Sequence, residues 1–269
     1  MIQRVISTVG LWAVVILSLV LFKAQGGIWL IVAFAALTQY EFYKLLRKIG
    51  YPSFSRLSLI LGSAIVLGAY YCPEQPLTAL ALVVAGCACV TRVRSGDALK
   101  AFLASASGII YIPFCMSYLI LPVHLVADEM TGLLIGFWIV VTAKFSDAGG
   151  YIVGTAFGRH KLAPTVSPGK TWEGAGGGVL ASVVVGTALV AVLPSHFPSG
   201  FLLWKVALAA IPIASVAIVS DLIESMIKRE AGAKDSGAII PGLGGFFDLI
   251  DSLILSAPVA YAIVLNFFL

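Results

Sequence analysis

The chain has 269 residues, of which 60% are hydrophobic and only 11% are charged. Soluble domains carry roughly 25% charged residues, so this composition excludes a soluble globular enzyme. The apolar residues form long unbroken runs, which disfavours a transmembrane β-barrel with its alternating strands. The net charge of +4 requires no nucleic-acid partner, because loop topology and anionic lipid headgroups account for it. The sequence therefore predicts an all-α, polytopic integral membrane protein.

Nine apolar runs are candidates for membrane-spanning helices. Crossing the hydrocarbon core takes about 20 residues, and a helix satisfies its own backbone hydrogen bonds in lipid. The expected spans are 5–22, 27–42, 57–72, 77–91, 101–123, 131–146, 174–194, 202–220 and 252–269. The first is interpreted as a span, because no A-x-A-like signal cleavage site follows it. We expect one integral-membrane domain over 1–269, with spans alone in 1–145 and the candidate active site in 146–269.

The basic residues predict the orientation of these spans. If the nine spans alternate in direction, 15 of the 17 Lys and Arg residues fall on one side. Loops rich in Lys and Arg stay in the cytoplasm, so the N-terminus is expected there and the C-terminus on the opposite face. The amphipathic segment 40–50 is expected to extend the second span along the cytoplasmic interface, as a basic anchor to anionic lipid.

Two polar clusters follow the sixth span. Asp147 is placed at the cytoplasmic end of that span, where a carboxylate is costly and therefore points to a function. The segment Ser167–Thr171 contains Gly-Lys-Thr, but Pro164 stands where a P-loop needs glycine, so that motif is excluded. What remains is a loop that can offer backbone N–H groups, hydroxyls and one ammonium group to a phosphate. It enters the glycine run Gly174–Gly178, which predicts close helix packing.

A third cluster combines two pairs of acids at i,i+3 spacing with three basic residues. These are Asp221 with Glu224, Asp248 with Asp251, and Lys228, Arg229 and Lys234. Carboxylates on one helix face at a membrane boundary repel one another unless a cation lies between them, and oxygen ligands of this kind suit Mg²⁺. Paired acids with nearby cations suit phosphoryl or nucleotidyl transfer. A structural ion-pair network, with Asp248 paired to Lys228 or Arg229, is the alternative.

These residues make the chain resemble the phosphatidate cytidylyltransferase family, also called CDP-diacylglycerol synthases. The family signature is Ser, Lys-Arg, Lys-Asp, Pro-x-His-Gly-Gly and Asp-Arg-x-Asp. Here it reads Ser225, Lys228-Arg229, Lys234-Asp235, Pro241–Gly245 and Asp248–Asp251 with the spacing kept. Asp147, the 167–174 loop and the 220–225 segment are also similar, so the match covers roughly residues 140–255. Leu243 and Leu249 depart from the signature, since they stand where the family has His and Arg.

The resemblance implies a Mg²⁺-dependent enzyme that transfers CMP from CTP to phosphatidic acid, giving CDP-diacylglycerol and pyrophosphate. It implies catalytic roles for Asp221, Asp248, Asp251 and Lys228, with the three acids holding the metal. The residues implied in substrate binding are Ser167, Lys170, Thr171, Arg229, Lys234, Asp147 and Asp235. The site is expected to face the cytoplasm from the cell (inner) membrane. A second, monovalent cation and a homodimer are left open.

Two alternatives remain at this point. Another lipid phosphate is one, because Leu243 and Leu249 leave room for a changed substrate or for lost activity. A transporter with a cytoplasmic-side acidic cation site is the other, and it predicts acids near the bilayer midplane in two related halves. A CDP-alcohol phosphotransferase is disfavoured, because its D-G-x-x-A-R…G-x-x-x-D-x-x-x-D pattern is absent.

Overall fold

The computed structural model describes residues 2–73, 97–239, 242 and 244–269. The predicted span 77–91 and the signature positions Pro241 and Leu243 therefore lie outside the described residues. The chain forms two compact units, and each is assembled from separate stretches of sequence. Unit 1 comprises Met1–Ile120 and Ile227–Ile250, and unit 2 comprises Leu121–Met226 and Asp251–Leu269. That the chain is one integral-membrane domain stays a prediction.

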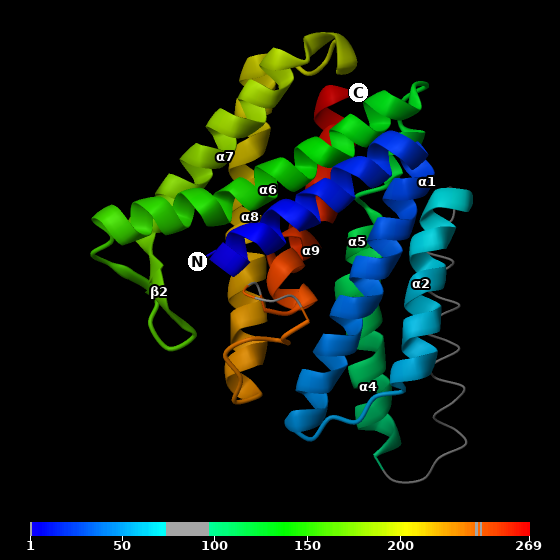
Figure 1. Cartoon of the computed structure of the whole chain (residues 1–269), viewed down its shortest axis with the longest axis vertical. Helices are drawn as coiled ribbons and strands as arrows, with labels where there is room; N and C mark the ends of the chain where they lie inside the picture. Colours follow the sequence, from blue (N-terminus) through cyan, green and yellow to red (C-terminus); the bar gives the residue numbers. More distant parts are fainter. Residues whose placement is uncertain (1, 74–96, 240–241, 243) are drawn as a thin grey trace. The chain divides into compact units, whose positions relative to one another are not determined.

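Unit 1 begins with α1 (Ile2–Lys48), which is sharply bent (Figure 1). The bend lies at Lys23, whose φ of 49° is in the left-handed region that interrupts a helix. Gly26 lets the two segments approach, because a Cβ there would lie 2.3 Å from the backbone oxygen of Ser18. The two segments correspond to the predicted spans 5–22 and 27–42.

Further helices of unit 1 pack beside α1 (Figure 1). They are α2 (Ser55–Tyr71), α4 (Ala98–Ile109), η1 (Ile110–Phe114, a π-helical turn) and α5 (Cys115–Ser117). A buried polar network joins α1 to α2 and α4. Gln39 Nε2 donates to the Tyr43 hydroxyl (2.9 Å) and to the Ser58 carbonyl (3.1 Å), and Tyr43 donates to the Ser105 carbonyl (2.9 Å). These bonds fix the rotation of α1 against α2 and α4.

The last turns of α1 are amphipathic, as the sequence predicts for 40–50. Phe42, Tyr43 and Leu45 are buried, whereas Lys44 and Lys48 are exposed. Glu41, however, is only 2% exposed, so this segment also carries a buried acid that the sequence reasoning did not single out. The role of the segment 40–50 as a basic anchor to lipid stays a prediction.

Unit 2 is built around α6 (Glu129–Phe157) and α7 (Trp172–Val192), which run side by side (Figure 1). Asp128 caps the start of α6, since its Oδ2 accepts from the Thr131 N–H and hydroxyl, each at 2.8 Å. These hydrogen bonds hold the pKa of the Asp128 carboxyl below its usual range. The packing is close because glycines meet backbone: a Cβ on Gly178 would lie 2.3 Å from the Ser146 carbonyl oxygen. The predicted role of the glycine run is therefore confirmed.

Two further long helices are α8 (Leu203–Glu230) and α9 (Phe246–Ile263), the latter extended by η4 (Val264–Phe268). Two short 3-10 helices, η2 (Leu121–His124) and η3 (Pro194–His196), precede α6 and follow α7. Helices α6, α8 and α9 all run beyond the predicted spans into the polar clusters. Asp147 does not end its helix, because α6 continues for ten further residues, so its place at the end of the membrane span stays a prediction. Apolar length marks where a helix can cross lipid, but a helix whose acids find cationic partners continues into polar sequence.

A two-stranded antiparallel hairpin follows α6, which the all-α prediction did not include. Its strands are β1 (Lys161–Ala163) and β2 (Ser167–Thr171), with Lys161 opposite Thr171. The segment predicted as a loop is therefore a strand that leads directly into α7. The Glu173 carboxylate closes the base of the hairpin, because it accepts from the Arg159 N–H at 3.1 Å and lies 2.6 Å from His160 Nδ1.

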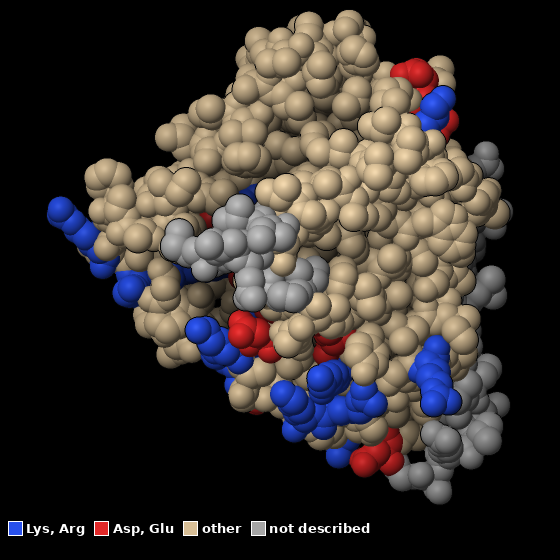
Figure 2. Space-filling model, in the orientation of Figure 1, with Lys and Arg blue, Asp and Glu red and all other residues tan. Residues whose placement is uncertain are grey.

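The part of the chain described contains six helices long and apolar enough to cross a membrane. They are Val9–Lys48, Ala98–Ser117, Glu129–Phe157, Trp172–Val192, Leu203–Glu230 and Phe246–Phe268, with Ser55–Tyr71 shorter. Figure 2 shows a face on which Lys, Arg, Asp and Glu side chains occupy a minor part of the surface. The structure thus agrees with a helical membrane protein, whereas the count of nine spans and the cytoplasmic N-terminus stay predictions.

Candidate active site

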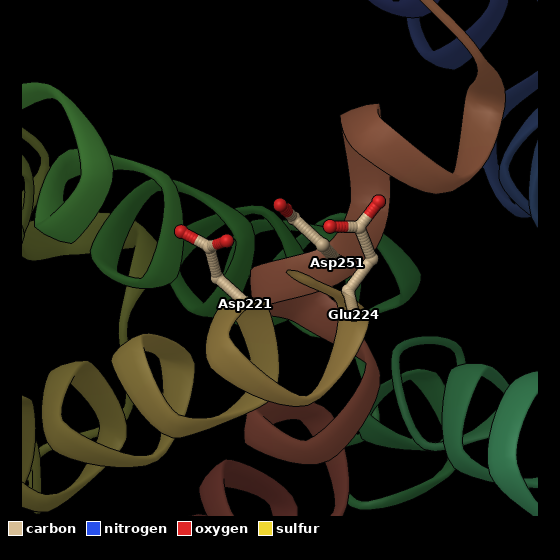
Figure 3. Close-up of side chains that lie close together, drawn as sticks. All are labelled: Asp221, Glu224 and Asp251. Atoms are coloured by element: carbon tan, nitrogen blue, oxygen red, sulfur yellow. The ribbon is translucent and has the colours of Figure 1, made fainter. Parts of the chain in front are cut away.

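Three carboxylates of unit 2 lie together (Figure 3): Asp221 and Glu224 from α8, and Asp251 from α9. One oxygen from each lies within 4.8 Å of the others. Glu224 is fully buried and Asp251 is 8% exposed, whereas Asp221 is partly exposed. The i,i+3 spacing of Asp221 and Glu224 gives them one helix face, as predicted.

Polar contacts fix α9 against α8 beside these acids. The Ser220 hydroxyl donates to the Asp251 carbonyl and accepts from the Leu255 N–H at 3.3 Å. The Ser252 N–H donates to Asp251 Oδ1 at 2.6 Å, which orients that carboxylate. The acids are therefore held by the packing of two helices rather than by a mobile loop.

Two lysines contact the acidic cluster. Lys144 Nζ lies 3.2 Å from Asp251 Oδ1 and 3.4 Å from Asp147 Oδ2. Lys170, at the end of β2, forms an ion pair with Asp221. The sequence reasoning counted Lys144 only among the basic residues of one membrane side. Its i,i+3 spacing to Asp147 is the signal that could have placed it in the site.

The acidic cluster and its surroundings offer several carboxylate groups to a cation. Asp147, Asp221, Glu224 and Asp251 contribute four carboxylates, whereas Lys144 and Lys170 contribute two ammonium groups. Carboxylate oxygens are the ligands that Mg²⁺ takes in proteins, so this donor set fits a divalent cation.

A pocket of about 420 Å³ in unit 2 reaches Asp221. Its walls come from α6, the hairpin, the start of α7 and α8. They comprise Ser146, Asp147, Gly150, Tyr151, Gly154, Thr155, Leu162, Ser167, Gly169, Lys170, Thr171, Gly174, Ala175, Ile218 and Asp221. Thr171 also caps α7, since its Oγ1 accepts from the Gly174 N–H at 3.1 Å. Four residues predicted from two separate motifs, Asp147, Ser167, Lys170 and Thr171, thus line one pocket with Asp221.

The remaining predicted site residues belong to unit 1. Lys228 Nζ lies 2.6 Å from Asp248 Oδ1, which is the ion pair named as the alternative. Asp248 Oδ2 accepts from the Ser236 N–H (3.0 Å) and the Gly245 N–H (2.8 Å). Arg229 donates to the Ala233 carbonyl at 3.2 Å. Lys234 and Asp235 are exposed. Metal binding by Asp248 stays a prediction.

Residues 2–267 match the model of the cytidylyltransferase family. The chain belongs to this family. Its residues are 39% identical over 153 positions to the phosphatidate cytidylyltransferase of Haemophilus influenzae, which covers 55% of this chain and 51% of that protein. The phosphatidate cytidylyltransferase of Mycobacterium leprae is 35% identical over 63% of this chain and 53% of its own length. That of Brucella suis is 38% identical over 69% of this chain and 64% of its own length.

The chain thus spans between about half and two thirds of the length of these relatives. The resemblance inferred from the signature residues is confirmed at the level of the family.

Proposed function

We propose that this chain is a phosphatidate cytidylyltransferase, which transfers CMP from CTP to phosphatidic acid and releases pyrophosphate. The observation that carries the proposal is the position of Asp221. It lies in the acidic cluster with Glu224 and Asp251, and it also lines the pocket with Lys170 and Thr171. Groups that suit a divalent cation and groups that suit phosphate therefore meet at one place. The names of the relatives support phosphatidate as the acceptor.

The pocket would hold the triphosphate of CTP. Lys170 offers an ammonium group, and Ser167 and Thr171 offer hydroxyls at the start of α7. Gly150, Gly154 and Gly174 also line the pocket, and they let α6 and α7 pack closely beside it, since a Cβ on Gly174 would lie 2.8 Å from the Gly150 carbonyl oxygen. Lys170 would exchange its ion pair with Asp221 for a phosphate oxygen when CTP enters.

Asp221, Glu224 and Asp251 would hold Mg²⁺, with Asp248 a predicted further ligand. When bound, Mg²⁺ supplies neutralisation of the negative charge on the triphosphate. Lys144 would orient Asp251 and Asp147 through the contacts described above. The basic residues Lys228, Arg229 and Lys234 are proposed to bind the phosphate of the lipid.

The transfer itself needs little from protein acids or bases. A phosphate oxygen of phosphatidic acid forms a bond to the α-phosphorus of CTP, and the bond from that phosphorus to the bridging oxygen of pyrophosphate breaks. The nucleophile is already an ionised phosphate oxygen, so positioning and charge neutralisation suffice. For this reason Leu243 and Leu249, in place of the family's His and Arg, are compatible with activity.

The direct test is transfer by the purified protein in detergent micelles with labelled CTP and Mg²⁺. We expect CDP-diacylglycerol and pyrophosphate in equal amounts with phosphatidic acid, and no product with EDTA. Matched reactions with an ether-linked phosphatidate and an isoprenoid phosphate report the acceptor. If product formed only with one of those other lipids, phosphatidate would not be the substrate. If no product formed with any of the three lipids, the proposed cytidylyltransferase activity would be contradicted.

We further propose that the site faces the cytoplasm, where CTP is found. Membranes containing the protein would be prepared as sealed vesicles of either orientation. Inside-out vesicles are expected to convert added CTP without permeabilisation, whereas right-side-out vesicles should require it. The reverse result would contradict the proposed orientation.

Replacing Lys170 by methionine should raise the KM for CTP by at least about tenfold, because a charge-assisted hydrogen bond is worth roughly 1.5–3 kcal/mol. The KM for phosphatidic acid should stay unchanged, since Lys170 is assigned to the nucleotide alone. Steady-state kinetics with each substrate varied in turn measure both constants. Lys161→Met, which changes the exposed first residue of β1 outside the pocket lining, is the matched control. Equal increases for both substrates would contradict the assignment.

A further inference from the structure

A buried acid of α1 contacts the start of α9 within unit 1. Glu41 Oε2 accepts from the Phe247 N–H and from the Ser236 hydroxyl, each at 2.9 Å. The Ser236 hydroxyl also lies 2.9 Å from Asp248 Oδ2. Glu41 is therefore joined to Asp248 through one hydroxyl group and through the first turn of the helix that carries it.

This contact completes a helix cap. In a capping box, a side chain at the N-cap accepts from an N–H of the first turn, and an acid at N3 accepts from the N–H of the N-cap. Gly245 is the N-cap of α9 and Asp248 is at N3, and the Gly245 N–H donates to Asp248 at 2.8 Å. Glycine has no side chain for the other half of the box. Glu41, 206 positions away in the sequence from Phe247, supplies it.

Two glycines make room for Glu41. A Cβ on Gly245 would lie 2.3 Å from Glu41 Oε2 and 2.1 Å from Ser236 Oγ. A Cβ on Gly237 would lie 2.2 Å from Glu41 Oε1. All three distances are far below van der Waals contact, so an ordinary N-cap residue such as serine cannot stand at position 245 while Glu41 keeps its place.

We propose that Glu41 is a positioning residue for the cytidylyl transfer, acting through Ser236 and the first turn of α9 to hold the Asp248–Lys228 pair. The inference rests on the proposed function, in which Asp248 and Lys228 take part. Burial of a carboxylate is costly, and a local serine or threonine would cap α9 without that cost. An acid from α1 instead ties Ser236 and the orientation of Asp248 to the helix bundle of unit 1.

The test compares Glu41→Gln, Ser236→Ala and the double variant in the transfer assay. Glu41→Gln keeps the size of the side chain and loses the charge that strengthens both hydrogen bonds. We expect kcat to fall by about tenfold, with the KM for CTP unchanged, because Glu41 does not line the pocket. Ser236→Ala should give a similar loss. The double variant should lose little more than either single one, because both changes break the same connection.

Hydrogen exchange of residues 231–239 and 244–249 provides a readout independent of activity. Glu41→Gln is expected to accelerate exchange there by at least about tenfold while leaving 129–157 unchanged. Glu230→Gln, an exposed acid at the end of α8, is the matched control and should alter neither readout. Wild-type kcat, unchanged exchange or additive losses in the double variant would overturn the inference. If the wild-type protein transfers no CMP, the proposed function fails, and the exchange rates alone then decide whether Glu41 holds this segment.

Discussion

Replacing Asp221 by asparagine is expected to lower kcat/KM for CTP by at least about 100-fold, which corresponds to about 2.7 kcal/mol of lost transition-state stabilisation. Asp221 is the residue common to the acidic cluster and the pocket, so its carboxylate serves both the cation and the nucleotide in the proposed site. The amide keeps the shape of the side chain but removes one of the charges that attract Mg²⁺. The Mg²⁺ concentration needed for half-maximal activity should therefore rise as well.

Asp97→Asn is the matched control for this variant. Asp97 lies at the start of α4, and its side chain is 64% exposed in an ion pair with Lys100. Exposed pairs of this kind contribute little to stability, so the control should leave the Mg²⁺ dependence unchanged. Initial rates over a series of MgCl₂ concentrations measure both variants. If Asp221→Asn transferred CMP with the wild-type Mg²⁺ dependence, Asp221 could not be a ligand of the cation.

The helices were predictable from the sequence because each contains a stretch of apolar residues long enough to cross a membrane. Eight of the nine predicted spans overlap described helices, although 101–123 continues past the end of α5 at Ser117 into a turn, and 77–91 lies outside the described residues. The helix ends were not predictable in this way. Asp147 and Asp221 lie within helices because Lys144 and Lys170 offset their charges, and such pairing depends on contacts between elements. The hairpin was missed because its strands are only three and five residues long.

The residues of the site were found to different degrees. Motif spacing indicated Asp221, Asp251, Lys170 and Thr171, and the structure brings them together in unit 2. Glu224 was noticed as the i,i+3 partner of Asp221 but was not assigned to the metal.

Glu41 was missed because its partners are about 200 positions away in the sequence. Local periodicity describes a single helix, so it cannot reveal what a different segment places against that helix.

Replacing Lys144 by methionine should strengthen Mg²⁺ binding, whereas Asp221→Asn should weaken it. Lys144 places an ammonium group 3.2 Å from Asp251 and 3.4 Å from Asp147, where it repels a cation held by the acidic cluster. Charges about 4 Å apart interact by roughly 4 kcal/mol near a protein surface, so removing this one should strengthen Mg²⁺ binding by at least about tenfold. The stability of the metal-free protein should fall by about 2 kcal/mol, less than for a fully buried pair, because the Lys144 side chain is 25% exposed.

Thermal unfolding in detergent over a series of MgCl₂ concentrations measures both effects of Lys144→Met. A ligand that binds only the folded state raises the unfolding temperature according to its concentration relative to its Kd. The variant should therefore begin below the wild type and gain more from each addition of Mg²⁺. Lys100→Met removes the lysine of an exposed i,i+3 pair and should leave this Mg²⁺ dependence unchanged. An unchanged Mg²⁺ dependence in Lys144→Met would contradict a cation at these acids, because the charge of Lys144 and its contact with Asp251 would both act on a cation held there.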